Sequence, residues 1–401
     1  MALWRGPPHN SCDSAHLAMN ILFLIAAATL TLTCLAGLEV VTGARRVKAL
    51  REMDPGMATN LPLVSIVVAA RNEERNIREA LQSLFDLDYP DYELIVVDDR
   101  SDDETGCILE RMSRERQRLR VIHVESLPQD WLGKNHALWV GSRLARGEYL
   151  LFTDADIVME PTVLTRAVMF MRKHRLDHLA ATPSLRMPSL FLDMFGASFI
   201  IFFSLFARPW KARDPKSRCH IGIGAFNMLR ADAYRGIGGH EAIRLRPDDD
   251  IKLGKLIKKA GLRQEAAYAP EFLFVEWYAS VGEVVRGLEK NAFAGTDYSV
   301  PLVLAGVLGQ TVCGIWPFLA IFLTGGAVQA MYLATVLVTL MVVADSARFH
   351  RSRPWYAIAY PLTSALFVYI LMRTMLLNLW QGGIYWRGTF YPLKELKKNR
   401  V

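Results

Sequence analysis

The pattern of apolar and polar residues divides the 401-residue chain into an apolar N-terminal segment, a mixed central region and an apolar C-terminal region. Leu17–Val41 is almost continuously apolar, carries one formal charge at Glu39, and is long enough to span a bilayer. A signal peptide is the alternative, but the apolar run is too long for one and no suitable cleavage site follows it. We therefore expect residues 1–16 to form a tail and residues 17–41 to form a transmembrane helix.

Residues 300–380 contain three further apolar segments, each predicted to be a membrane segment: Val300–Gly325, Val328–Ala344 and Trp355–Trp380. Three crossings would place the basic tail, residues 381–401, on the side of the membrane opposite to the central region, against the cytoplasmic preference of basic residues. One segment is therefore expected to be re-entrant or interfacial. Pro301–Pro317 is the candidate, because it is the richest in Gly and Pro.

Residues 61–298 alternate short β-branched runs with helical patterns, which is typical of one α/β domain. The first run, Leu63–Ala69, has the near-continuous apolar character of a parallel strand buried on both faces. Further strands are expected at residues 93–97, 120–124 and 149–156, with a helix between each pair. This order predicts a doubly wound, mostly parallel sheet, with a ligand site at the carboxyl ends of its strands.

Ser189–Trp210 is apolar enough to be mistaken for another membrane span. Asp193 interrupts it, and a crossing here would place Asp154 and Asp250 on opposite sides of the membrane. We interpret residues 189–210 as an interfacial helix whose following basic residues lie at the lipid headgroups. A buried core helix is the alternative.

Charge distribution indicates a membrane partner and an orientation. The net charge is +7, and the basic clusters flank membrane segments, which favours anionic lipid headgroups over nucleic acid. The cluster Arg45–Arg51 follows the first segment, whereas the preceding tail carries only Arg5, so residues 44–299 are expected to be cytoplasmic. The five cysteines show no metal-binding spacing and are expected to be free thiols. The chain is thus predicted to be a multi-pass protein of the cell membrane.

Candidate chemistry collects at the expected ligand edge of the sheet. The strand from Tyr149 runs into Asp154 and Asp156, and residues two apart in a strand point to the same side. Two such carboxylates suit Mg²⁺ or Mn²⁺ that also binds phosphate oxygens. A solvated acidic turn is the alternative for this short motif alone. No Gly-x-Gly-x-x-Gly follows the first strand, so the dinucleotide-binding fingerprint is absent.

Four stretches in this order resemble the donor-site motifs of family 2 glycosyltransferases, which have the GT-A fold: Val64–Asn76, Leu94–Asp102, Gly133–Leu138 and Leu150–Ile157. The resemblance implies a nucleotide-sugar donor, with a UDP-sugar the first expectation. It implies that Asp98 and Asp99 bind the nucleoside, and that Asp154 and Asp156 hold a divalent cation on the diphosphate. The other residues that it places near the donor are Ala70, Arg71, Glu73 and Lys134.

A second acidic motif follows at Arg246–Leu253, where a helix is expected to begin and to end before Gly261. The family carries an acidic pair here, with the second acid as catalytic base and a Leu three residues later. Leu253 sets this register, so the resemblance makes Asp250 the base and Asp249 its acidic neighbour. Asp248 is expected to provide no more than a cap or dipole contact.

The chain departs from the processive members of the family, which carry Gln-x-x-Arg-Trp downstream. In its place, Val285–Gly295 resembles the membrane-bound, non-processive branch that includes hopanoid- and carotenoid-associated glycosyltransferases. Arg286 and Lys290 lie four residues apart on one helix face and are expected to hold the leaving diphosphate or a headgroup, unless they are simply basic residues beside a membrane segment.

The sequence therefore predicts an inverting, metal-dependent glycosyltransferase that acts on a lipid hydroxyl. A polysaccharide synthase and a non-catalytic membrane protein that binds nucleotide sugars are the alternatives.

Overall fold

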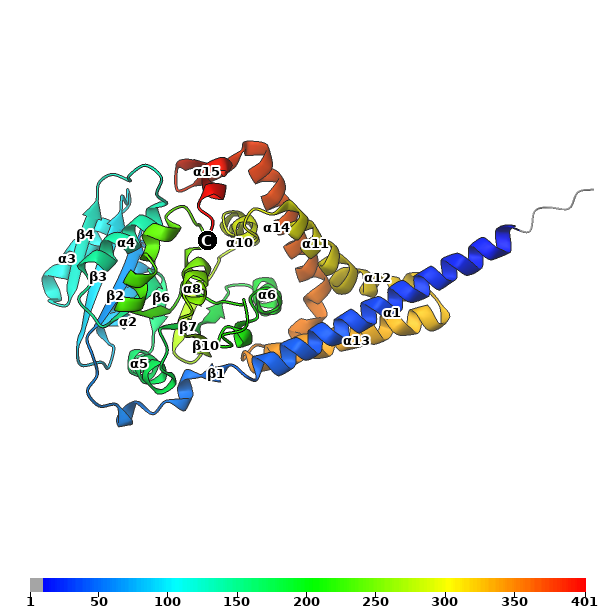
Figure 1. The fold of residues 1–401 in the computed structure, drawn as a ribbon, viewed down its shortest axis with the longest axis horizontal. Coiled ribbons are helices and arrows are strands. Elements are labelled where there is room, and N and C mark those ends of the chain that lie inside the picture. The colour runs from blue at the N-terminus through cyan, green and yellow to red at the C-terminus, as the bar shows by residue number, and fades with distance from the viewer. Residues whose placement is uncertain (1–9) are drawn as a thin grey trace, which may run out of the picture.

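The structure is a computed structural model that describes residues 10–401, with side chains from Met19 onward. An α/β domain forms one end of the molecule, and long helices extend from it to the other end (Figure 1). Helix α1 (Asn10–Ala44) contains the predicted first membrane segment and continues beyond it in both directions. Residues 1–9 of the predicted tail lie outside the described part of the chain.

The α/β domain is built on one eight-stranded sheet with the order β1-β10-β7-β9-β5-β2-β3-β4. The pairs are parallel except where β9 runs antiparallel to β5 and β7. The predicted doubly wound, mostly parallel sheet is therefore confirmed. The strands are β1 (Lys48–Ala49), β2 (Val64–Ala70), β3 (Tyr92–Asp99), β4 (Leu119–Val124), β5 (Tyr149–Asp154), β7 (His178–Thr182), β9 (Asn227–Arg230) and β10 (Gln264–Tyr268).

Helices cover both faces of this sheet, and alternate residues of each central strand face the two layers. In β2, for example, Ile66 and Val68 pack into one buried cluster while Val67 packs into the other. The first layer contains α2 (Ile77–Phe85), α3 (Thr105–Glu115) and α5 (Val163–His174). The second layer contains α4 (Gly133–Leu144), α7 (Ala231–Gly236) and α8 (Asp249–Lys259).

A second sheet of three short strands lies next to the ligand edge of the first: β6 (Ile157–Met159), β11 (Leu273–Glu276) and β8 (Ser184–Arg186). Strand β6 follows β5 after a two-residue turn, and β8 leads directly toward helix α6. The small sheet therefore connects the edge where the carboxylates gather to the apolar helices.

Helix α6 (Leu190–Ala207) packs between the α/β domain and the apolar helices. Both of its ends return to the α/β domain, through β8 at its start and through a short helical turn (Pro209–Lys211) beside β10 at its end. Lys211 Nζ lies 2.5 Å from Glu39 Oε1 of α1, so this basic residue binds a carboxylate. The position of α6 in the membrane interface stays a prediction.

Among the described residues, five helical segments are long and apolar enough to cross a membrane: Met19–Ala44, Leu190–Lys211, Val300–Leu323, Gly326–Phe349 and Pro354–Gln381. The third consists of α11 (Val300–Gln310) and α12 (Trp316–Leu323), joined by a single π-helical turn. Pro317 lies in the first turn of α12, where a missing N–H is tolerated. Helix α13 (Gly326–Phe349) then packs along α1.

Helix α14 (Tyr360–Gln381) turns back to the α/β domain rather than extending away from it (Figure 1). Before it, Arg351 Nη2 lies 2.6 Å from Glu271 Oε1 of the α/β domain. After it come a hairpin of β12 (Gly383–Trp386) and β13 (Thr389–Pro392) and the short helix α15 (Leu393–Lys398). Leu396 of α15 is fully buried against Leu132 and Leu245. Both ends of α14 therefore contact the same domain.

Candidate active site

Three elements bring opposite charges together at the carboxyl edge of the sheet. Lys134, in the first turn of α4, has its Nζ 2.7 Å from Oδ1 of Asp154 at the end of β5. The same Nζ lies 3.6 Å from Oδ1 of Asp249, in the first turn of α8. The two acidic motifs lie nearly one hundred residues apart in the chain, with α6 between them in sequence. They nevertheless form one site, so both lie on the same side of α6 in space.

Backbone contacts hold the starts of α4 and α8 against each other. The amide of Leu132 donates to the Arg244 carbonyl at 2.9 Å. The fully buried Asn135 amide group donates to the carbonyls of Ile243 at 2.8 Å and Arg246 at 2.9 Å. Since Asn135 directly follows Lys134, these bonds fix the ammonium group in front of α8.

A loop of small residues at 222–225 lies between Asp154 and Asp250. The Gly224 amide donates to Asp250 Oδ2 at 2.8 Å, and the Ile251 amide donates to Oδ1 at 2.7 Å. A Cβ atom at Gly224 would lie only 2.7 Å from Asp154 Oδ2. A side chain there would push the two carboxylates apart, so the close approach requires glycine.

The pKa values of the carboxylates reflect burial and crowding. Burial alone would raise the pKa of Asp154, but the Lys134 ammonium outweighs it and lowers that pKa below its usual range. Burial, with repulsion from Asp154 and Glu73, raises the pKa of Asp156 to about 7. Burial, with repulsion from Asp249, raises the pKa of Asp250 to about 7. The site thus has more negative charge than its lysine neutralises.

The strand argument for Asp154 and Asp156 needs a correction. Strand β5 ends at Asp154, and Asp156 lies in the turn before β6, so the two are not successive same-face residues of one strand. The turn nevertheless keeps them close enough for Asp154 to raise the pKa of Asp156. In the part of the chain that the structure describes, no group of three or more metal-ligating side chains occurs. Two hard oxygen ligands in an over-acidic site fit Mg²⁺ or Mn²⁺ whose remaining ligands come from substrate.

Asp98 and Asp99 project to opposite sides of β3. Asp99 Oδ2 lies 3.7 Å from Arg71 Nη1, and a Cβ added to Gly133 of α4 would collide with the same carboxylate. Asp98 Oδ2 instead contacts His123 Nδ1 at 2.9 Å, on the side of α3. Of the predicted nucleoside pair, only Asp99 faces the site of Lys134. Ala70, at the end of β2, is fully buried and pairs in register with Asp98.

The basic pair predicted on α9 (Val281–Glu289) is divided between the site and the surface. Lys290, which follows the last residue of the helix, lies close enough to Asp154 and Asp249 to interact with their charges. Burial, with repulsion from Lys134, lowers the pKa of Lys290 to about 8. Arg286 lies on the exposed face of α9. The short helix α10 (Ala292–Gly295) follows.

Asp248 has a different role from the predicted cap. It makes no capping bond to the helix; its carboxylate binds the guanidinium of the fully buried Arg246, with Nε to Oδ1 at 3.0 Å. Lys252 Nζ lies 3.3 Å from its other oxygen. Asp297, after α10, closes this network at 2.9 Å from Arg246 Nη2. The first of the three aspartates therefore stabilises the fold beneath the site.

Arg387 at the tip of the C-terminal hairpin also reaches the site, and sequence reasoning missed it. Its Nη2 lies 3.4 Å from Oε1 of Glu73, which directly follows the first strand's ligand edge. The sequence predicts only a basic tail for residues 381–401. The signal that was present is the Arg387-Gly388 pair between two short aromatic runs, a pattern typical of a tight hairpin.

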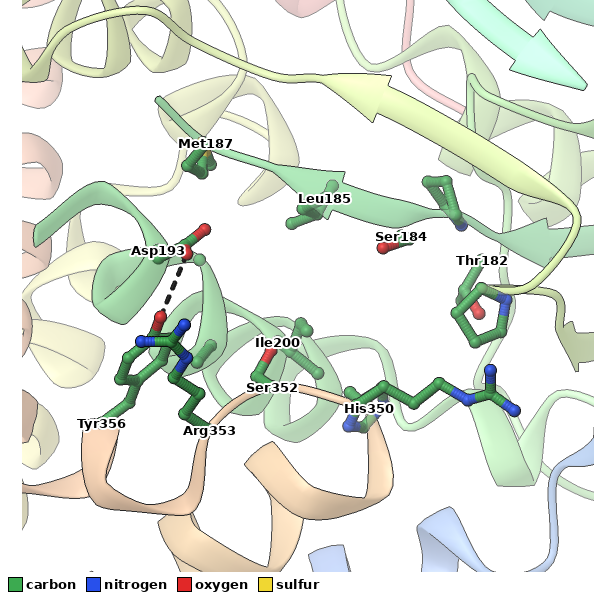
Figure 2. A pocket seen from close by; sticks show the side chains of 15 residues that line it. Thr182, Ser184, Leu185, Met187, Asp193, Ile200, His350, Ser352, Arg353 and Tyr356 are labelled. Carbon is green, nitrogen blue, oxygen red and sulfur yellow. Dashed lines mark hydrogen bonds between the residues drawn. The ribbon is translucent and has the colours of Figure 1, made fainter. Parts of the chain in front are cut away.

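A separate pocket of about 200 Å³ lies where β8, α6 and the segment between α13 and α14 meet. Figure 2 shows Asp193 of α6 in its wall, accepting a hydrogen bond from the Tyr356 hydroxyl at 3.1 Å. His350, Arg351 and Arg353 also line the pocket. The aspartates of the site do not line this cavity, which lies at the junction between the α/β domain and the apolar helices.

The fold is similar to that of the mannosyltransferase PcManGT from Pyrobaculum calidifontis, solved in complex with GDP-Man and Mn²⁺. The TM-score is 0.54 at 18% identity, and the match covers 90% of this chain and 99% of that one. This likeness shows that the chain has the GT-A fold. Residues 65–238 match the family model described as glycosyl transferase family 2.

Two curated relatives extend the comparison. The 4,4'-diaponeurosporenoate glycosyltransferase of Staphylococcus aureus strain MRSA252 is 21% identical over 342 residues, which are 84% of this chain and 90% of the relative. The beta-monoglucosyldiacylglycerol synthase of Trichormus variabilis is 34% identical over 128 residues, but these cover only 31% of this chain and 27% of the relative. The predicted resemblance to family 2 and the assignment as an enzyme are therefore confirmed.

Proposed function

We propose that this protein is an inverting, metal-dependent glycosyltransferase that moves a sugar from a nucleotide sugar to a lipid hydroxyl at the cytoplasmic face of the cell membrane. The observation that carries the proposal is the Lys134 ammonium between Asp154 and Asp249. Through this lysine, the carboxylates that would hold a donor diphosphate lie directly beside the acidic residues at the start of α8. A direct displacement needs this proximity of donor and base.

The donor would lie along the carboxyl ends of β2, β3 and β5. Asp154 and Asp156 would hold Mg²⁺ or Mn²⁺, which supplies positive charge to the diphosphate when it is bound. Asp99 and Arg71 face the same edge and are placed to bind the nucleoside. The resemblance favours UDP, whereas PcManGT was solved with GDP-Man, so both nucleotides belong in the test.

Asp250 is the proposed base. Its carboxylate is held by two backbone amides and lies beside the loop that touches Asp154. It would take the proton of the acceptor hydroxyl while the hydroxyl oxygen bonds to the anomeric carbon and the bond from that carbon to the diphosphate breaks. One such displacement inverts the anomeric configuration. Lys134 would stabilise the charge that develops on the leaving diphosphate.

A lipid acceptor is proposed because apolar helices adjoin the catalytic domain. Helices α6 and α14 both pack against it, and the cavity of Figure 2 lies at this junction. The names of the two relatives refer to a carotenoid acid and a diacylglycerol glycolipid. An acceptor of the second kind would present a hydroxyl at the membrane surface.

The membrane arrangement that we propose has three crossings, formed by α1, by α11 with α12, and by α13. Helices α6 and α14 would lie at the interface, since both begin and end at contacts with the catalytic domain. This places the basic C-terminal residues on the same side as Arg45–Arg51, which satisfies the positive-inside rule. In this arrangement α14, rather than the Pro301–Pro317 stretch, is the non-crossing segment.

The decisive test is product formation. The purified protein in lipid nanodiscs would be incubated with Mn²⁺, a panel of UDP-sugars and GDP-mannose, and a lipid extract of the source organism, and the lipids analysed by mass spectrometry. A glycolipid with one added sugar, absent with Asp250→Asn and missing from a deletion strain, is expected. A growing polymer would instead establish a polysaccharide synthase, and nucleotide binding without turnover would establish a binding protein.

A further inference from the structure

The C-terminal hairpin has a geometry that aims one arginine at the donor site. Trp386 pairs with Thr389, so Arg387 and Gly388 form a two-residue turn between β12 and β13. Both have positive φ, 48° and 80°, as a tight hairpin of this kind requires. Gly adopts this conformation at no steric cost, but an arginine does not. Local turn chemistry therefore gives no reason for arginine at this position.

The hairpin is firmly attached to the segments that build the site. Ile384 and Tyr391, one from each strand, are buried in the same cluster as Leu132 and Leu245. Beyond the hairpin, the Asn399 side chain donates to the Ala242 carbonyl and accepts from the Leu245 amide, both at 3.0 Å. Leu132 precedes Lys134 by two residues, so the same buried cluster holds both the hairpin and the segment that carries Lys134.

Arg387 reaches the site with most of its hydrogen-bonding capacity unused. The side chain is 34% exposed, and its Nη2 contacts Glu73 Oε1 at 3.4 Å, a long contact. Burial lowers the pKa of Arg387 and raises the pKa of Glu73. Their mutual attraction therefore offsets the cost of burying the two charges only in part. A guanidinium has five N–H donors in a planar fork that matches phosphate oxygens.

Two further cations lie nearby. Lys290 Nζ is 4.6 Å from the ring centre of Trp386, the residue next to Arg387 in the hairpin. The positive charges of Lys290 and Lys134 both act on Asp154. Arg387 acts on the same carboxylate, from an element that lies more than two hundred residues further along the chain. The site is thus lined by three cations around the carboxylates.

We propose that the β12–β13 hairpin is part of the donor site, and that Arg387 binds phosphate oxygens of the nucleotide sugar. The inference rests on the proposed function, since it assigns a residue to the same site. It makes the C-terminal segment a component of donor recognition rather than a basic tail.

The test is calorimetric titration of the full-length detergent-solubilised protein with UDP and with GDP in the presence of Mn²⁺. Arg387→Gln is expected to lower the affinity for the nucleotide that wild type binds. The expected loss is about ten- to a hundred-fold, the usual effect of losing charge-assisted hydrogen bonds. Arg400→Gln removes the same charge from an exposed position of the same segment and is the matched control, expected to bind like wild type. Equal thermal stability of both variants would show that the fold is retained.

Three outcomes would overturn the inference, and they are distinguishable. Unchanged binding by Arg387→Gln, with wild type binding normally, would remove Arg387 from the donor site and leave the proposed function intact. Restored binding in Arg387→Gln with Glu73→Gln would show that the arginine only neutralises Glu73. Loss of dodecyl phosphate binding without loss of nucleotide binding would assign Arg387 to a lipid phosphate. Wild type that binds neither nucleotide would instead overturn the proposed function itself.

Discussion

At the scale of single residues, three consecutive aspartates have three different environments. Asp248 is 4% exposed and paired with a buried arginine; Asp249 faces Lys134; Asp250 is held by two amides beside Asp154. Their order in the sequence does not predict this difference, because the contacts come from α4, the 222–225 loop and the chain after α10. Each environment leads to a separate expectation for the same substitution.

Asp250→Asn is expected to lower turnover by roughly a hundred- to ten-thousand-fold while nucleotide binding stays close to wild type. The asparagine keeps the size of the side chain but cannot take a proton from the acceptor. Turnover and nucleotide affinity would be measured on the same preparation by product mass spectrometry and calorimetry. Near-normal turnover in this variant would mean that the base lies elsewhere.

The activity should also depend on pH in a direction that Asp250 sets. Its pKa is raised to about 7 by burial and by Asp249, and only the deprotonated form can act as base. Turnover is therefore expected to fall as the pH decreases below about 7 and to reach a plateau above it. The measurement is kcat/KM against pH, which reports the pKa values of the enzyme before substrate binds. A rate that is constant between pH 5 and pH 8 would contradict Asp250 as the titrating base.

Asp248→Asn is expected to affect stability rather than chemistry. It removes the charge that balances buried Arg246, and breaking such a buried pair costs about 3 kcal/mol. The melting midpoint should fall, while the protein that remains folded keeps its nucleotide affinity. Asp91→Asn, at an exposed position of the same domain, is the control and should melt like wild type. An unchanged midpoint for Asp248→Asn would contradict the structural role.

At the scale of elements, the position of α14 and α6 decides which side of the membrane each connection occupies. Helices α12 and α13 form a hairpin that extends away from the catalytic domain beside α1, whereas α14 returns to it (Figure 1). The polar contact between Ser198 of α6 and Thr363 of α14, 2.8 Å between hydroxyl oxygens, joins the two proposed interfacial helices. The two helices pack against each other and against the α/β domain.

Cysteine accessibility tests this arrangement. In a cysteine-free background, single cysteines at Ser113, Ser217 and Lys394 are expected to resist an impermeant maleimide in intact cells. Gly325→Cys, in the connection between α12 and α13, is expected to react. Labelling at Lys394 without labelling at Ser217 would mean that α14 crosses the membrane, and labelling at Ser217 without labelling at Ser113 would mean that α6 does. Labelling at Ser113 would reverse the proposed orientation.

At the scale of the whole molecule, the site combines segments from across the chain. Asp154 and Asp156 come from the sheet edge, Asp250 from α8 and Arg387 from the C-terminal hairpin. The carboxylates raise one another's pKa values, which is a cost that bound metal and diphosphate would relieve. Donor binding should therefore require a divalent cation.

Nucleotide affinity is expected to fall by at least tenfold when Mn²⁺ is removed by chelation, and similarly in Asp156→Ala with Mn²⁺ present, since both changes remove the bridge to the diphosphate. Calorimetric titration of wild type and variant, each with and without Mn²⁺, measures both effects. Asp86→Ala, at an exposed position outside the site, is the control. Equal affinity in all four cases would remove the metal assignment.

The sequence by itself determined the local features of this protein. The β-branched run at 63–69, the order of strands and helices, and the lengths of the apolar segments were readable because each depends on neighbouring residues and on periodicity. The order and spacing of the motifs also singled out Asp154, Asp156, Lys134 and Asp250 as candidates, because the proposed reaction needs carboxylates and an ammonium group at these positions.

Only the tertiary structure decided which side chains meet. That Asp98 faces His123 while Asp99 faces the site follows from the helices packed on the two faces of β3. That Asp248 is structural follows from the burial of its neighbour Arg246, which also binds the distant Asp297, and that Arg387 reaches Glu73 follows from the return of α14. No local pattern encodes this burial or the long-range contacts, because they depend on how the layers and the apolar helices pack around one sheet edge.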